Sequence, residues 1–197
     1  MIGRDFWYDV MRSGAILGIV MALMHVVEQY ILVYSDKSLM SVSALYLLAW
    51  TVSAVIFIWL LVRFSKRRAA AMDPKFGYSY SLALSYILMI SMLAGVIVGV
   101  VGKIYIAIMG YDLYVEGLVG RVEDLRTIYA EANLTQFNSD FDKMIDALRT
   151  AEQPSMLSSV FSSFNTYIFT GGLPGLIIAA IVSRKPKFYI NDDENNE

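Results

Sequence analysis

The sequence contains no cysteine and only one histidine. Without cysteine the chain can form no disulfide framework, no thiolate metal site and no thiol redox centre. A single histidine excludes the paired-histidine zinc motifs, and the sequence contains neither a nucleophile elbow nor a phosphate-cradling glycine loop. We therefore expect a protein that is not an enzyme and that holds no cofactor and no metal.

Charged residues are also scarce, at 17% of 197 residues, whereas 57% are hydrophobic. A bilayer core of about 30 Å needs roughly 20 consecutive apolar residues for one spanning helix. Four segments meet this length, at residues 15–33, 42–62, 82–109 and 156–182. The first is too long for a signal peptide and no small-residue cleavage site follows it, so we expect it to remain as an anchor. The sequence predicts an all-α membrane protein with four transmembrane helices.

The basic residues gather in two short segments, after the second and the fourth apolar run. They are Arg63, Lys66, Arg67, Arg68 and Lys75 in the first segment and Arg184, Lys185 and Lys187 in the second. Basic clusters in short loops mark the cytoplasmic side, so both termini are predicted to be cytoplasmic. The natural partner of the first cluster is the anionic headgroups of the lipid bilayer, not nucleic acid.

The charge distribution also divides the chain into regions. Residues 1–110 and 156–185 are predicted to form the membrane domain, with residues 111–155 as an extracytoplasmic insertion. The aromatic group Phe6, Trp7 and Tyr8 is expected to lie along the inner membrane surface. Residues 186–197 end in an acidic run that is expected to be a disordered cytoplasmic tail.

The predicted extracytoplasmic segment, residues 111–155, is rich in acidic residues. Apolar residues recur in it at three- and four-residue spacing, from Leu118 to Tyr129 and again from Phe137 to Leu148. This spacing predicts two amphipathic helices separated near residues 133–136. Such helices could cap the membrane domain, lie on the outer leaflet or bind a partner.

Small residues follow one face of the first and third predicted helices. Gly14, Gly18 and Ala22 are spaced by four residues in the first, and Gly95, Gly99 and Gly102 lie on a stripe in the third. Small residues let two helix backbones approach closely. We expect the stripe of the third helix to pack on the first helix of the same chain, with self-association as the alternative.

Four polar side chains inside the predicted membrane region are candidates for a polar pocket. His25, Glu28 and Gln29 share one face of the first helix, and Lys103 lies in the third. At about 1.5 Å per residue, Glu28 and Lys103 both lie roughly 9 Å below the outer boundary. They could form a buried pair above His25 in a polar pocket, or each could extend towards the headgroups.

The fourth predicted helix contains the sequence GGLPG, with Gly171, Gly172, Pro174 and Gly175. Proline removes one backbone hydrogen bond, so a kink or a local break is expected. Broken helices form substrate sites in transporters, although simple kinks are far commoner.

Three motifs together indicate a family. They are RSGAILGIVMAL at residues 12–23, FGYSYSLAL at residues 76–84 and GLPGLIIAAIVSRK at residues 172–185. With these motifs, the chain resembles the bacterial membrane proteins catalogued as domain of unknown function 4199. The resemblance implies a four-helix protein of the bacterial inner membrane with a variable outer loop, and it brings no activity, cofactor or site residue.

Two hypotheses for the function follow. The first is a non-enzymatic accessory or scaffold protein whose outer segment or small-residue helix faces engage a membrane or periplasmic partner. The second is a small oligomeric transporter or lipid-handling protein that uses the polar residues of the first and third helices. A polar cavity reaching His25 would favour the second, whereas a tightly packed bundle would exclude it.

Overall fold

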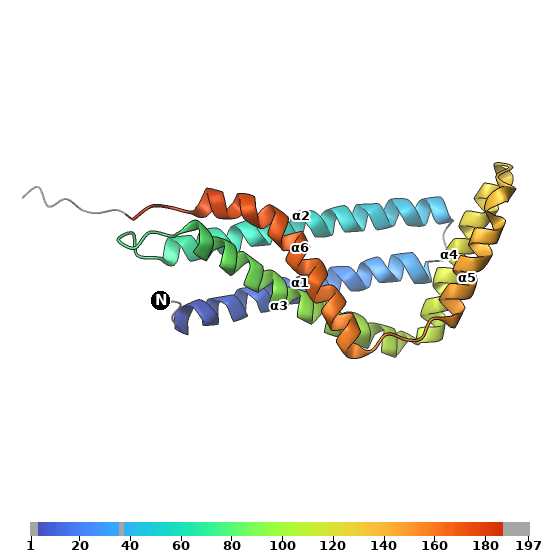
Figure 1. Ribbon diagram of the computed structural model, residues 1–197, viewed down its shortest axis with the longest axis horizontal. Coiled ribbons are helices and arrows are strands. Elements are labelled where there is room, and N and C mark those ends of the chain that lie inside the picture. Colours follow the sequence, from blue (N-terminus) through green and yellow to red (C-terminus); the bar gives the residue numbers. More distant parts are fainter. Residues whose placement is uncertain (1–3, 36–37, 187–197) are drawn as a thin grey trace, which may run out of the picture.

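The computed structural model describes residues 4–35 and 38–186. In order, these residues form α1 (Arg4–Tyr34), α2 (Leu39–Ala71), α3 (Tyr80–Met109), α4 (Tyr111–Glu131), the short 3₁₀ helix η1 (Thr135–Phe137), α5 (Asn138–Thr150) and α6 (Met156–Val182). The long helices α1, α2, α3 and α6 form one elongated bundle, and α4 and α5 stand across one of its ends (Figure 1).

The four long helices contain 31, 33, 30 and 27 residues. Each is long and apolar enough to cross a membrane, which confirms the predicted fold class. The fourth predicted span coincides with α6, whereas α1 begins before its apolar run and α2 ends after its own. Arginine, lysine and alanine favour helix, so α2 continues through the basic cluster to Ala71. The protein is therefore a multi-pass membrane protein.

The first residues of α1 correct the expectation for the amino-terminal aromatic group. Because the helix begins at Arg4, Phe6 and Val10 lie one turn apart on its inner face and are 2% and 3% exposed. The Phe6 ring packs edge-on against Tyr86, with ring centroids 6.0 Å apart. Trp7 and Tyr8 remain exposed. The expectation of a surface position is therefore wrong for Phe6.

Helix α3 lies between α1 and α6 and contributes the most deeply buried residues of the bundle, including Ile87, Ile90 and Ala94. On the α1 side, a Cβ atom added at Gly14 would lie 2.9 Å from Leu93, and one added at Gly18 would lie 2.7 Å from Ile97. Both distances are shorter than van der Waals contact. The expected contact between the first and third helices is confirmed.

The glycines of α3 face two different helices. A Cβ atom at Gly95 would lie 2.8 Å from the carbonyl oxygen of Ser163 in α6, and one at Gly99 would lie 2.7 Å from the Cα atom of Val160. Gly102 instead faces His25 of α1. The expectation that the whole stripe packs on the first helix is wrong, because α6 crosses the bundle obliquely and covers part of it (Figure 1).

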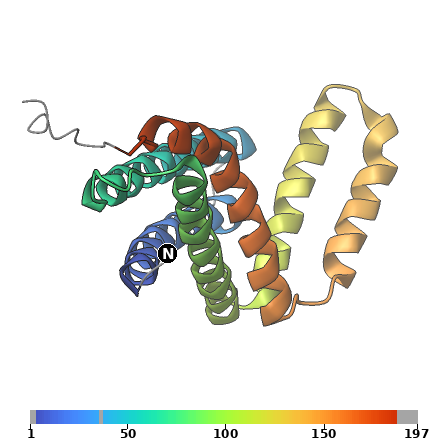
Figure 2. The same cartoon turned by 60° about the vertical axis from the view of Figure 1, so that its left-hand side comes forward.

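Helix α6 is continuous through the GGLPG motif, with Pro174 inside it. Figures 1 and 2 show a bend in its carboxyl-terminal part. Gly171 lies directly against the Ser91 hydroxyl, and a Cβ atom at Gly175 would lie 3.0 Å from Ile87. Of the two expected outcomes, a kink or a local break, α6 therefore shows the kink, because it bends without breaking.

Helices α4 and α5 form an antiparallel hairpin at one end of the bundle (Figure 2). Tyr129 packs edge-on against Phe137 and Phe141, and the Arg126–Asp142 ion pair joins the two helices at 3.0 Å. The predicted pair of helices separated near residues 133–136 is confirmed. Among the described helices, α4 contacts α1, α2 and α3, whereas α5 contacts only α4 and η1. Only α4 therefore packs as the expected cap.

The opposite end of the bundle is closed by the segment after α6. Tyr78 and Arg184 exchange two backbone hydrogen bonds of 2.9 Å, and the Arg184 guanidinium donates to the carbonyls of Ala69 and Met72 at the end of α2. Gly77 has a φ of +66°, and a Cβ atom there would lie 2.7 Å from the nitrogen of Pro186. Most of the predicted tail, residues 187–197, lies outside the described residues.

Candidate functional site

A cavity of about 290 Å³ lies between α1, α2, α3 and α6. Its polar and aromatic lining consists of His25, Glu28, Tyr46, Trp50, Ser53, Phe57, Ser162, Ser163, Thr166, Tyr167 and Thr170. All of these belong to the helices that can cross a membrane. Ionisable side chains at membrane depth are costly and usually face a functional interior, so this cavity is the candidate site.

Helix α1 supplies both ionisable groups of the predicted pocket that reach the cavity. His25 and Glu28 are three residues apart, so they face the same side of the helix. Gly102 of α3 leaves room for the imidazole, because a Cβ atom there would lie 3.2 Å from its Nε2 atom. Glu28 lies about 9 Å and His25 about 13 Å from the end of α1 at Tyr34. The cavity therefore contains two of the four residues of the predicted pocket, and both come from α1.

The partner of Glu28 comes from α2. The Ser53 hydroxyl donates a hydrogen bond to the Glu28 carboxylate, and it also lies 2.9 Å from the carbonyl oxygen of Ala49. Ser53 is 4% exposed and Glu28 is half-buried, so this polar contact is partly buried within the bundle. One carboxylate oxygen thereby accepts from a neutral donor.

Lys103 does not pair with Glu28. Its ammonium group donates instead to the carbonyl oxygen of Pro154, 2.5 Å away, in the segment that leads into α6. It lines a second cavity of about 220 Å³ between α3, α4 and α6, together with Tyr111 and Tyr114. Burial raises the pKa of the Tyr114 phenol above its usual range, so this tyrosine stays neutral. The sequence placed Glu28 and Lys103 at equal depth but could not show which side of each helix they occupy.

Gln29 is the fourth residue of the predicted pocket, and it lines neither of these two cavities. It follows Glu28 directly, so its side chain points about 100° away around the helix. Of the four predicted residues, the structure brings together His25 and Glu28.

Helix α6 supplies a polar wall that we did not predict. Its residues recur every three or four positions along one face, and they are Ser162, Ser163, Thr166, Tyr167 and Thr170. The Tyr167 ring packs edge-on against Phe57 of α2, with centroids 5.6 Å apart. The signal in the sequence is the hydroxyl-rich run SSVFSSFNTYIFT at the start of this helix.

Pro174 changes the chemistry of this wall, although it does not break the helix. A proline has no backbone N–H, so the carbonyl of Thr170, four residues earlier, lacks its usual helical donor. Thr170 lines the cavity. The residue that carries this carbonyl therefore belongs to the α6 wall.

The cavity opens sideways between α2 and α6. At its rim, Trp50 of α2 is 55% exposed, and Ser162 and Thr166 of α6 are also exposed. The α1 residues at its floor are more enclosed, with Met21 6% exposed. The polar interior of the cavity is thus accessible from the exposed sides of two spanning helices, α2 and α6.

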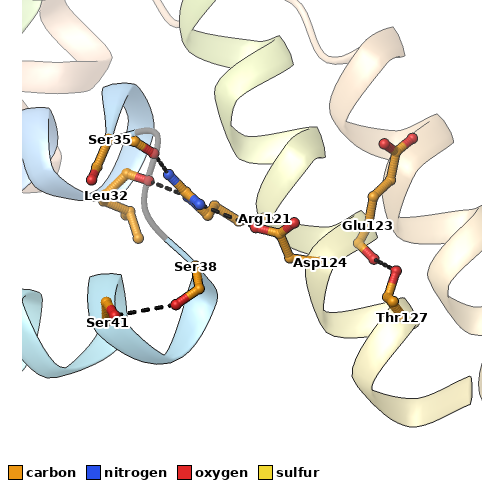
Figure 3. Close-up of polar contacts among 8 residues, drawn as sticks. All are labelled: Leu32, Ser35, Ser38, Ser41, Arg121, Glu123, Asp124 and Thr127. Atoms are coloured by element: carbon orange, nitrogen blue, oxygen red, sulfur yellow. Dashed lines mark hydrogen bonds and ion pairs between the residues drawn. The ribbon is translucent and has the colours of Figure 1, made fainter. Parts of the chain in front are cut away.

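Arg121 holds α4 of the hairpin against the end of α1. Its guanidinium donates to the carbonyl oxygens of Leu32 and Ser35 at the end of α1, and it pairs with Asp124 at 3.1 Å (Figure 3). The last carbonyls of a helix have no donor within the helix, so the arginine supplies them. Gly117, one turn earlier in α4, lies directly against Val33. These contacts hold α4 on the bundle.

The acidic and imidazole side chains of the described residues form no group of three that could hold a metal ion. Comparison with curated proteins and with solved structures gave no match. The sequence model of one family matches residues 12–184, which is most of the chain. The chain therefore belongs to the family described as Protein of unknown function (DUF4199).

Proposed function

We propose that the protein is a non-enzymatic protein of the bacterial inner membrane that binds the polar end of an amphiphilic molecule in the cavity between α2 and α6. The observation that carries the proposal is the polar interior with His25 and Glu28 that opens sideways on the surface of spanning helices. An amphiphile diffusing in the bilayer reaches such an opening without leaving the membrane. Its chain can then stay in lipid.

The size of the cavity supports a ligand whose polar end enters the cavity while its chain stays in lipid. At about 290 Å³ the cavity is large enough for a small polar group. Sites for whole drug-sized ligands usually measure roughly 300–1,000 Å³. The polar end therefore enters, and the chain lies along the exposed apolar side chains of α2 and α6, such as Val55 and Phe169.

The orientation is part of the proposal. The basic residues at the end of α2, in the α2–α3 connection and in the segment after α6 lie at the end of the bundle opposite the hairpin (Figure 1). Basic clusters favour the cytoplasmic side, so we place both termini in the cytoplasm and the α4–α5 hairpin outside. Glu28 then lies in the outer half of the membrane.

The proposal is tested by filling the cavity. Ala54 lines it, whereas Ala44 is exposed on the same helix and lies outside it. We expect native mass spectrometry from mild detergent to show one retained amphiphile on the wild type and on Ala44→Phe, and none on Ala54→Phe. Equal retention by the two variants would contradict binding in this cavity.

A second candidate function is that of an accessory protein that engages a partner through α5. The observation in its favour is that α5 contacts only α4 and η1 among the described helices. Its exposed residues include Asp146 and Asp140, whose side chain is 62% exposed, and residues 111–155 together carry nine acidic and four basic residues. This charge fits a partner protein with a basic surface.

Crosslinking in native membranes tests the second candidate. Here a defined crosslinked partner should disappear when Asp140 and Asp146 are both replaced by lysine and should persist in the Ala54→Phe variant. A chain that is recovered alone, or only as a homo-oligomer, would exclude the accessory role.

A further inference from the structure

We infer that the polar end of the bound amphiphile is a protonated amine, an inference that rests on the proposed function and names the class of its ligand. The charge of the lining residues is the first reason. The cavity lining contains one carboxylate, Glu28, and no lysine or arginine. An anionic headgroup would meet a negative charge at membrane depth, where repulsion is screened far less than in water.

His25 does not reverse this preference. As a neutral imidazole it adds no charge to the cavity. As an imidazolium one turn from Glu28 it would only cancel the carboxylate, so an anion would still meet no net positive charge. Lys103, the one basic residue at similar depth, is directed to Pro154 and lines the other cavity.

The supply of hydrogen-bond acceptors is the second reason. An ammonium group has three donors and no acceptor. Ser53 supplies one donor to the Glu28 carboxylate, which has two oxygens and about four acceptor positions. Ser162, Thr166 and Thr170 line the opposite wall, and their hydroxyl oxygens can also accept hydrogen bonds. The cavity therefore offers acceptors from two sides.

Aromatic rings are the third reason. Tyr46 and Trp50 of α2 and Tyr167 of α6 line the same cavity as Glu28. The faces of tryptophan and tyrosine rings attract cations, and the attraction grows when water is excluded. A carboxylate combined with several aromatic rings is the usual chemistry by which proteins recognise ammonium groups.

Trp50 provides a native reporter for the test. The chain has three tryptophans, and replacing Trp7 and Trp59 by phenylalanine leaves Trp50 alone. The probes are an octadecylammonium and an octadecyl sulfate, each with a nitroxide quencher near the polar end, added to the protein in phosphatidylcholine vesicles. We expect the ammonium probe to quench Trp50 saturably. The apparent affinity of the sulfate probe for the wild type, and of the ammonium probe for the Glu28→Gln variant, should each be at least about tenfold weaker.

Glutamine keeps an oxygen that can accept from Ser53, so Glu28→Gln tests charge with little change in packing. Ser53→Ala keeps the carboxylate and is expected to retain selectivity for ammonium. Equal saturable quenching by both probes would overturn the amine inference and leave the proposed function standing. Quenching that rises linearly with both probes would overturn both the amine inference and the proposed function. Displacement of the ammonium probe by equimolar ethylammonium would identify a soluble amine and contradict an amphiphile.

Discussion

The Ser53 hydroxyl of α2 donates to the Glu28 carboxylate of α1. This contact joins two helices inside the bundle at the cavity that also contains His25 and Tyr167. It explains how a carboxylate can remain at membrane depth without a basic partner, because a buried polar group needs a hydrogen-bond donor. The same carboxylate lines the cavity, where a ligand could contact it.

Removing the Ser53 hydroxyl tests this contact. We expect Ser53→Ala to lower the free energy of unfolding by about 1 kcal/mol, the usual size for a hydrogen bond between membrane helices. Ser43→Ala, at an exposed position of the same helix, should leave stability unchanged. Unfolding in mixed micelles measures both. Equal stability of the two variants would show that the contact does not stabilise the fold.

Gly99 tests the packing of α3 on α6. A Cβ atom there would lie 2.7 Å from the Cα atom of Val160, so Gly99→Ala must push the two backbones apart. We expect a loss of about 1–3 kcal/mol, typical of overpacking. Gly120 in α4 has open space around its Cβ position. Gly120→Ala should be neutral or gain up to about 1 kcal/mol from helix propensity, and a loss at Gly120 as large as at Gly99 would contradict the packing.

Arg121 tests the attachment of the hairpin (Figure 3). Arg121→Ala removes the donors to Leu32 and Ser35, so amide hydrogen exchange in α4 should accelerate about tenfold or more. Arg126 pairs with Asp142 in a more exposed setting. Arg126→Ala should change α4 exchange little, as expected for a surface ion pair. Unchanged exchange in Arg121→Ala would mean that other contacts hold α4.

The orientation can be tested directly because the chain has no cysteine. Single cysteines at Asp146 in α5 and at Lys75 before α3 report on opposite ends of the bundle. In intact cells, a membrane-impermeant maleimide should label Asp146→Cys and should label Lys75→Cys only after lysis. The reverse pattern would place the hairpin in the cytoplasm.

Hydropathy and periodicity predicted the elements of the fold well. The four apolar runs became α1, α2, α3 and α6, and the interrupted periodicity after Met109 became α4 and α5. Both signals are local, since they depend on which residues repeat along one segment. The position of Phe6 could not be predicted in this way, because its burial depends on Tyr86, which is distant in the sequence.

The candidate site was only half predictable. His25 and Glu28 could be named because ionisable residues are rare in apolar runs, and their shared face follows from their spacing. Their partners depend on how the helices rotate and cross. Because Glu28 and Lys103 lie at equal depth, Lys103 was the expected partner of Glu28. The crossing of the helices instead brings Ser53 to Glu28 and directs Lys103 to Pro154. Serine and threonine are tolerated in membrane helices, so the α6 wall gave a weaker signal than the charges.

The central claim is that an amphiphile of the bilayer places its polar end in the cavity between α2 and α6. The most direct measurement is photocrosslinking in vesicles with an alkylammonium that carries a diazirine near its polar end, with the crosslinked residues identified by mass spectrometry. We predict crosslinks concentrated on cavity residues such as Met21, Trp50 and Tyr167, and their loss in Ala54→Phe. Crosslinks spread over the exposed faces of all four spanning helices, and unchanged in Ala54→Phe, would contradict the claim.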